Sequence, residues 1–341
     1  MNLYEENGYL DMAKIIGMKS PFIFIVGGRG IGKTYGAIKY VLENDITFML
    51  SRRTQMQADI ISSPDMSPLK SPCDDLGIKY TCEPIIKNCS GIYIEDSTGE
   101  ISLRGYTTAL STMSSIRGFD SSDVTIWLYD EFIPERHERA LKLEGEGFLN
   151  AYETINRNRE LIGRDPLKCV CMSNSNDIGS PIFETLALME IVEKMEHKKQ
   201  EIYTNVERGI TIILPRNSPI SEKKKQTALY KAVPKDSRFI EMSIGNTFEI
   251  ESCIQSRPLN EYKLLVSIGS VNVYTHKSNS GEYYVSQHRT GTAPKYKTDR
   301  TSIIQFRTAY RFLQGAYLMD TIDFENIRLK RNFEEIFVIK P

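Results

Sequence analysis

Hydrophobic residues in the first two thirds of the chain fall mainly into short continuous runs bounded by glycine, proline or polar residues. Such runs are typical of strands that are buried on both faces of a parallel sheet. The predicted strands are 22–26, 47–50, 124–129 and 169–172. Residues 33–43 and 147–161 instead suit helices, the second with apolar positions at helical spacing. Strands that alternate with helices predict an α/β fold with a mainly parallel sheet.

Two other regions follow different patterns. The segment 78–106 contains two short apolar stretches on either side of a turn-rich sequence, which predicts antiparallel strands. The last part of the chain predicts a small α+β domain, with strands at 262–270 and 282–287 and helices at 303–318 and 324–337. Prolines, a lysine run and weak periodicity between these regions predict a linker or small lid. The expected division is 1–214, 215–250 and 251–341.

Composition and charge narrow the class of protein. The chain is 40% hydrophobic and 26% charged, as in ordinary globular proteins, and it has no apolar run of about 18 residues that could span a membrane. Six irregularly spaced cysteines predict free thiols in a reducing compartment, and the four histidines do not have zinc-ligand spacing.

The net charge of −1 conceals an asymmetry between the two ends of the chain. Residues 1–214 carry 23 Lys and Arg against 31 Asp and Glu, whereas residues 215–341 carry 20 against 13. A basic C-terminal part is compatible with a polyanionic partner and equally with a lysine-rich solvated surface. The same ambiguity applies to two smaller basic groups, Arg52 with Arg53 and the run Lys223 to Lys225. Each group could line a channel for a polyanion or simply face solvent.

A phosphate-binding motif follows the first predicted strand directly and begins the first predicted helix. Its residues are Gly27, Gly28, Arg29, Gly30, Ile31, Gly32, Lys33 and Thr34, which satisfy G-x-x-x-x-G-K-[ST]. Glycines allow backbone N–H groups to converge on phosphate oxygens, and the helix N-terminus favours negative charge. Lys33 is expected to bridge the β- and γ-phosphates of ATP, and the Thr34 hydroxyl to bind Mg²⁺. The strand and helix flanks favour this interpretation over a glycine-rich turn without a nucleotide.

Further polar residues at loop and strand ends complete the expected site. Asp130 ends a strand where it can reach Mg²⁺, and Glu131, expected on the opposite side of the pleat, can activate water as a general base. Asn174 follows the predicted strand 169–172 in a short polar segment. Its side chain could sense the γ-phosphate of ATP, or it could cap the next secondary-structure element. Arg29 could hold the γ-phosphate in cis or pair with a carboxylate.

Four segments together resemble one family. The sequences at 27–34, 128–133, 156–160 and 169–174 are similar to those of the genome-packaging ATPases of small podophages, compact relatives of large terminases in the ASCE class of P-loop proteins. The resemblance runs through most of the chain and is more specific in the N-terminal part. It implies an ATP-driven motor that moves double-stranded DNA into a prohead in the host-cell cytoplasm. It also implies a ring of five subunits at the portal vertex, and leaves open whether a packaging RNA takes part.

The resemblance also assigns roles to single residues. Arg157 matches a trans-acting arginine finger, which would neutralise charge on the γ-phosphoryl group of the next subunit. Arg117 matches a basic position at the subunit interface. The C-terminal part resembles a reduced ribonuclease-H-like nuclease domain. Its first predicted strand carries no acidic residue, although such nucleases need carboxylates that converge on two metals, so we expect no nuclease activity.

Three other functions are alternatives to a DNA-packaging motor, and each predicts a different result. A hexameric P-loop helicase would unwind forked DNA without a prohead, and a small terminase with an active nuclease would cut DNA. A scaffold that binds nucleotide without turnover would be insensitive to replacement of Glu131.

Overall fold

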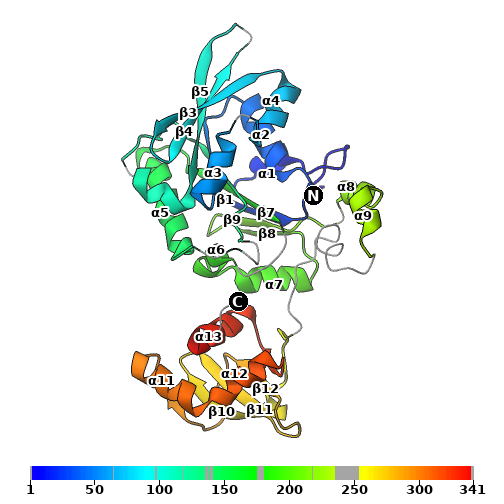
Figure 1. The fold of residues 1–341 in the computed structure, drawn as a ribbon, viewed down its shortest axis with the longest axis vertical. Helices are drawn as coiled ribbons and strands as arrows, with labels where there is room; N and C mark the ends of the chain where they lie inside the picture. Colours follow the sequence, from blue (N-terminus) through cyan, green and yellow to red (C-terminus); the bar gives the residue numbers. More distant parts are fainter. Residues whose placement is uncertain are drawn as a thin grey trace. The chain divides into compact units, whose positions relative to one another are not determined.

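The computed structural model describes residues 2–63, 65–96, 98–116, 118–134, 138, 141–174, 180–216, 218–234 and 253–338. The chain divides into two compact units, Met1–Glu249 and Ile250–Pro341 (Figure 1). Every described helix is too short or too polar to traverse a lipid bilayer.

A nine-stranded sheet forms the centre of the first unit, with the order β3-β4-β5-β2-β6-β7-β1-β9-β8 among the described residues. The strands are β1 (Phe22–Gly27), β2 (Phe48–Arg52), β3 (Lys79–Ile86), β4 (Cys89–Glu95), β5 (Ile101–Ala109), β6 (Ile126–Asp130), β7 (Lys168–Asn174), β8 (Ile202–Asn205) and β9 (Ile210–Ile213). The central strands, from β5 to β9 in this order, are parallel, while β3, β4 and β8 add antiparallel pairs at the two edges. The predicted mainly parallel sheet is therefore confirmed.

Helices cover both faces of this sheet, as its buried strands require. One face packs against α1 (Met12–Ile16), α2 (Lys33–Glu43) and α4 (Lys70–Leu76) through an aliphatic core. The other face packs against α5 (Glu144–Asn156) and α6 (Pro181–Thr185) through aromatic side chains. Trp127 of β6 stacks on Phe148 of α5 with ring centroids 5.3 Å apart, and Phe24 meets Phe183 of α6 at 5.4 Å.

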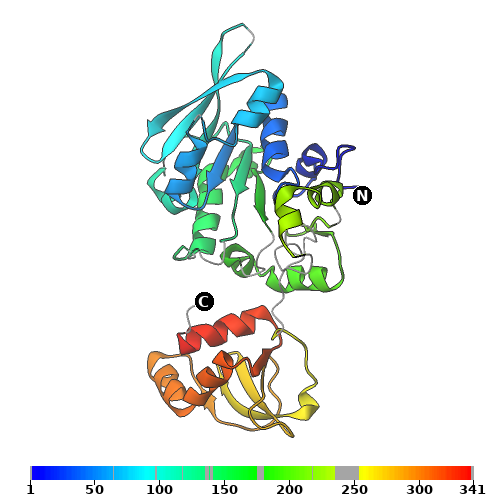
Figure 2. The ribbon, with the colours of Figure 1, turned by 45° about the vertical axis from the view of Figure 1, so that its right-hand side comes forward.

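Several elements of the first unit were not predicted. They are α3 (Gln55–Ile61), α7 (Met189–His197), and strands β8 and β9, together with α1, α4 and α6. Strand β9 pairs with β1 and is fully buried. Its apolar run resembles that of β1 and could have been recognised from the same signal. The region predicted as a linker or lid contains two short helices, α8 (Pro219–Lys224) and α9 (Ala228–Ala232). In Figures 1 and 2 these helices lie beside the N-terminal segment.

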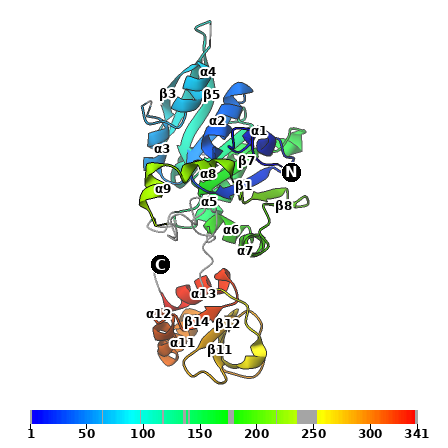
Figure 3. The ribbon, with the colours of Figure 1, turned by 90° about the vertical axis from the view of Figure 1, so that its right-hand side faces the viewer.

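The second unit has a five-stranded sheet of order β13-β10-β11-β12-β14. Its strands are β10 (Tyr262–Ile268), β11 (Val271–His276), β12 (Tyr283–Ser286), β13 (Lys295–Tyr296) and β14 (Ile322–Phe324). Helices α11 (Arg300–Ala309), α12 (Arg311–Leu318) and α13 (Ile327–Phe337) pack on one face of it (Figure 3). The predicted helix 303–318 is thus two helices, separated at Tyr310. The small α+β character was predicted correctly.

Candidate nucleotide-binding site

The loop between β1 and α2 has the backbone that its glycines predict. Gly30 and Gly32 adopt positive φ angles of 64° and 92°, a region that disfavours residues with a side chain. Gly32 also packs against Tyr9, so that a Cβ at this position would lie 3.1 Å from the Tyr9 side chain. Backbone N–H groups at the start of α2 can therefore face a phosphate group.

Lys33, the first residue of α2, folds back over the loop. Its Nζ donates hydrogen bonds to the carbonyl oxygens of Gly27 (2.9 Å) and Gly28 (2.7 Å), and to Asn174 Oδ1 (3.3 Å). Asn174 reaches this position because β7 pairs with β1 in parallel, with Gly27 opposite Asn174. The structure thus places the predicted sensor residue directly against the predicted phosphate-binding lysine.

Thr34 and Asp130, the two predicted Mg²⁺ ligands, lie side by side. Thr34 Oγ1 donates to Asp130 Oδ1 at 2.9 Å, and the Asp130 side chain is only 5% exposed. A hydroxyl and a carboxylate oxygen are the hard donors that Mg²⁺ prefers, so these residues fit the metal. Together with neighbouring residues they line a hollow of about 170 Å³: Gly30, Gly32, Lys33, Thr34, Tyr35, Asp130, Glu131, Ser173 and Asn174.

Arg52, at the end of β2, holds both acidic residues of the site. Its Nη2 lies 3.1 Å from Asp130 Oδ2 and its Nη1 lies 3.2 Å from Glu131 Oε2. The sequence prediction that Glu131 points to the opposite side of the pleat was therefore wrong. Strand β6 ends at Asp130, and Glu131 has a φ angle of 55°, so the alternation of a strand does not apply to it.

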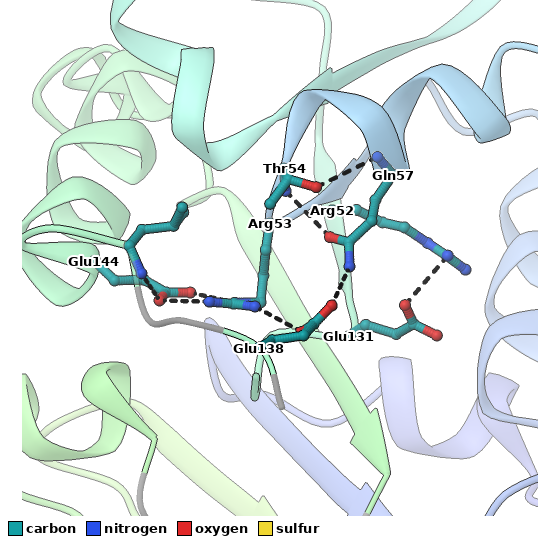
Figure 4. Close-up of polar contacts among 8 residues, drawn as sticks. Arg52, Arg53, Thr54, Gln57, Glu131, Glu138 and Glu144 are labelled. Carbon is teal, nitrogen blue, oxygen red and sulfur yellow. Dashed lines mark hydrogen bonds and ion pairs between the residues drawn. The ribbon is translucent and has the colours of Figure 1, made fainter. Parts of the chain in front are cut away.

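Arg53, the next residue, forms ion pairs with a different set of acidic residues (Figure 4). Its guanidinium binds Glu144 in bidentate fashion, at 2.6 and 3.0 Å, and donates to Glu138 at 2.8 Å. Gln57 donates to the other oxygen of Glu138 at 3.0 Å. The side chains of Arg52 and Arg53 are 17% and 1% exposed, so both are held in ion pairs and largely withdrawn from solvent. Their acidic partners are distant in sequence, which explains why the sequence did not reveal this.

Replacing Arg53 by Ala should destabilise the first unit strongly. Glu144 has a fully buried side chain, and without Arg53 it would lose its cation. We expect the free energy of unfolding to fall by about 3–5 kcal/mol. Urea unfolding followed by fluorescence of Trp127, the single tryptophan, measures this unit. The double variant Arg53→Met, Glu144→Leu should recover most of the loss, whereas a loss below about 1 kcal/mol in Arg53→Ala would contradict the assignment.

Burial sets the charge state of the Lys33 amine. The pKa of this amine is lowered to about 7, mainly by desolvation, with smaller lowering effects of Lys224 and Arg29 that Asp130 and Glu131 oppose. The amine therefore loses its proton as pH rises through about 7. Bound phosphates would favour the protonated form and raise this pKa again.

Nucleotide binding should consequently take up a proton above neutral pH. The dissociation constant of MgATP should rise with pH above about 7, by at most about tenfold per pH unit, because free Lys33 must first be protonated. Calorimetric titrations at pH 8.5 in two buffers of different ionisation enthalpy measure the uptake. The same titrations at pH 6, where Lys33 is protonated in both states, should show none. Equal heats in both buffers at pH 8.5 would contradict this account.

Two neighbouring arginines that follow α5 have different environments. Arg159 is buried and donates to the carbonyl oxygen of Val124 at 2.6 Å, which is a structural role. Arg157 has a side chain 36% exposed, lies 3.5 Å from Asp120 and donates to the carbonyl oxygen of Phe119. Arg157 is not among the residues that line the hollow around Lys33. Arg117, the other predicted interface residue, lies outside the described residues.

Comparisons with known proteins show the family of this chain. A model of the family described as podovirus DNA encapsidation protein (Gp16) matches residues 4–286. The chain belongs to this family. The DNA packaging protein of Bacillus phage phi29 is 24% identical over 230 residues, which cover 66% of this chain and 61% of that protein. The DNA packaging protein of Bacillus phage B103 is 25% identical over 234 residues, 67% of this chain and 64% of that protein. The chain therefore matches less than two thirds of the length of these curated relatives.

Solved structures support the same fold along almost the whole chain. A chain of the bacteriophage Phi-29 viral genome packaging motor assembly superposes with a TM-score of 0.66 at 18% identity, covering 98% of both chains. A chain of the Phi-28 gp11 DNA packaging motor gives a TM-score of 0.61 at 16% identity and covers 98% of this chain and 100% of that one. At these identities the similarity shows the fold alone.

Proposed function

We propose that this protein is the ATP-hydrolysing subunit of a phage motor that moves double-stranded DNA into a prohead. The observation that carries the proposal is the convergence of a lysine, a hydroxyl, two carboxylates and an amide on one hollow beside the loop. Membership of the DNA-encapsidation family supports DNA, the prohead and its portal as partners. The motor would work as a homo-oligomeric ring, of five subunits, in the host-cell cytoplasm, with a packaging RNA as a further candidate partner.

The predicted site residues have distinct parts in hydrolysis under this proposal. The loop from Gly27 to Gly32 and the Lys33 amine would hold the phosphates, with Arg29 as a second cation beside them. Thr34 and Asp130 would hold Mg²⁺, which offsets phosphate charge when it is bound. Glu131 would orient and deprotonate the attacking water, and Asn174 would register the loss of the γ-phosphate through its contact with Lys33.

Arg52 would position Glu131 for its part as a base. The Glu131 carboxylate lies 3.2 Å from the Arg52 guanidinium, which holds it beside the hollow. Arg157 would complete the site of the adjacent subunit, because its exposed side chain is not part of its own hollow. Turnover would then depend on assembly of the ring, and Arg117 would contribute at the same interface.

The second unit would bind DNA or the portal rather than cut DNA. We propose that 1–214 is the ATPase domain, 215–250 a lid, and 251–341 a reduced relative of ribonuclease-H-like nucleases. An antiparallel meander of β10, β11 and β12 with β13 parallel to β10 supports this relationship. Two acids of this unit are already engaged, because Asp323 pairs with Arg257 at 2.8 Å and Glu325 accepts a hydrogen bond from Ser286 at 2.6 Å.

The test is a phosphate-release assay on the purified chain, alone and with double-stranded DNA and proheads. We expect slow turnover by the dilute chain and a large increase when both partners are present, together with protection of the DNA from added nuclease. The DNA recovered from the assay should be free of new nicks. Strand separation of forked DNA without proheads would instead indicate a helicase, and cutting in Mg²⁺ or Mn²⁺ an active nuclease.

A further inference from the structure

Lys224 differs from the two lysines beside it. Lys223 and Lys225 are exposed, and Lys225 pairs with Glu222 of the same helix at 2.6 Å. Lys224, the last residue of α8, is half-buried, and burial lowers the pKa of its amine. The lysine run therefore splits into two surface residues and one that points inward.

The segment that carries Lys224 is attached to the N-terminal residues of the first unit. Ser218 Oγ donates to the carbonyl oxygen of Gly8 at 3.4 Å, and Pro219 packs so closely on Gly8 that a Cβ there would meet it at 3.0 Å. The Tyr4 hydroxyl donates to the carbonyl oxygen of Arg216, just before α8. The N-terminal segment in turn contacts the phosphate loop, because the Leu10 N–H donates to the carbonyl oxygen of Ile31. These contacts together place α8 over the loop.

The Lys224 amine lies against the phosphate loop. It donates a hydrogen bond to the carbonyl oxygen of Arg29, and a Cβ placed on Gly30 would lie 2.8 Å from its Nζ. It is also one of the cations that lower the pKa of Lys33. Three cationic side chains, Arg29, Lys33 and Lys224, thus come from two separate segments to one short loop. Positive charge gathered in this way, which Asp130 and Glu131 offset only in part at Lys33, favours an anion at the loop.

We propose that Lys224 binds the γ-phosphate of ATP in the same subunit, so that α8 acts as a lid that closes over the loaded loop. This inference rests on the proposed function and adds a residue that the phosphate-binding motif does not contain. Loss of the γ-phosphate would remove a partner of Lys224 and loosen α8. The lid would therefore distinguish ATP from ADP.

The test compares affinities for a fluorescent non-hydrolysable ATP analogue and for fluorescent ADP. Lys224→Met should weaken binding of the ATP analogue by about tenfold or more and binding of ADP by much less, because a charge-assisted hydrogen bond is lost only from the triphosphate complex. Lys224→Arg, which keeps the positive charge, should restore part of the preference. Lys223→Met and Lys225→Met are matched controls on the same helix and should bind both nucleotides as the wild type does.

The outcomes separate this inference from the proposed function. Unchanged affinities in Lys224→Met, with saturable binding by the wild type, would overturn the lid role alone. Equal losses for both nucleotides together with a lower melting temperature would show a purely structural attachment of α8, which also overturns it. No binding by the wild type would overturn the proposed function, and the lid role with it.

Discussion

Replacing Glu131 by Gln should lower ATP turnover by about 10²-fold or more, the usual size of a general-base effect. The amide has nearly the same shape but cannot accept a proton from water. Glu131 lines the hollow beside Lys33 and Thr34, and its side chain is 41% exposed, so water can reach it. Binding of ATP should persist, because the loop, Lys33 and Thr34 are unchanged.

Phosphate release by the DNA- and prohead-stimulated protein measures the effect. Glu146→Gln is a suitable control, because it removes an exposed carboxylate from the first turn of α5, outside the hollow. We expect that control to hydrolyse ATP at the rate of the wild type. If Glu131→Gln also kept the wild-type rate, Glu131 would not be the base and the mechanism proposed here would be wrong.

Arg157→Ala should reduce turnover of the assembled ring by about 10³-fold or more, as expected for removal of an arginine finger. The variant should leave turnover by the dilute chain nearly unchanged, since Arg157 is not among the residues lining its own hollow. Its partners within the chain are weak or exposed, namely Asp120 at 3.5 Å and the backbone at Phe119, so its release for a neighbouring subunit requires little rearrangement.

Mixing variants tests whether Arg157 acts between subunits. Arg157→Ala subunits keep an intact base and Glu131→Gln subunits keep an intact finger, so mixed rings should regain part of the activity that each variant lacks alone. Arg164→Ala, a nearby exposed arginine whose Nη2 donates to the carbonyl oxygen of Ser122 at 3.1 Å, is the control and should remain active. Absence of any recovery, or equal turnover at all protein concentrations, would contradict a finger that acts in trans.

The parts of the site that local sequence dictates could be predicted. The phosphate loop follows from glycines, a lysine and a threonine at fixed spacing between a buried strand and a helix. The placement of Asp130, Glu131 and Asn174 around one hollow could be predicted, because each follows an apolar run and the carboxyl ends of parallel strands meet at one edge of a sheet. Strand β7, which lies between β1 and β6, brings Asn174 onto Lys33.

Residues whose roles depend on distant partners could not be assigned from sequence. Arg52 meets Asp130 and Glu131 because β2 lies beside β6 in the sheet, and no local pattern encodes that pairing. The orientation of Glu131 depends on a backbone with positive φ, which glutamate rarely adopts. Lys224 reaches the loop only because α8 docks on the N-terminal segment, whereas composition alone predicted a linker or lid.

An equilibrium titration of the purified chain with labelled ATP and Mg²⁺ tests the central claim most directly. The account predicts saturable binding by the wild type, and loss of that binding in Lys33→Ala, because the amine that bridges Gly27, Gly28 and Asn174 is the cation expected on the phosphates. Circular dichroism of the variant would verify that its fold is retained. Saturable binding that persists in a folded Lys33→Ala protein, or its absence in the wild type, would contradict the account.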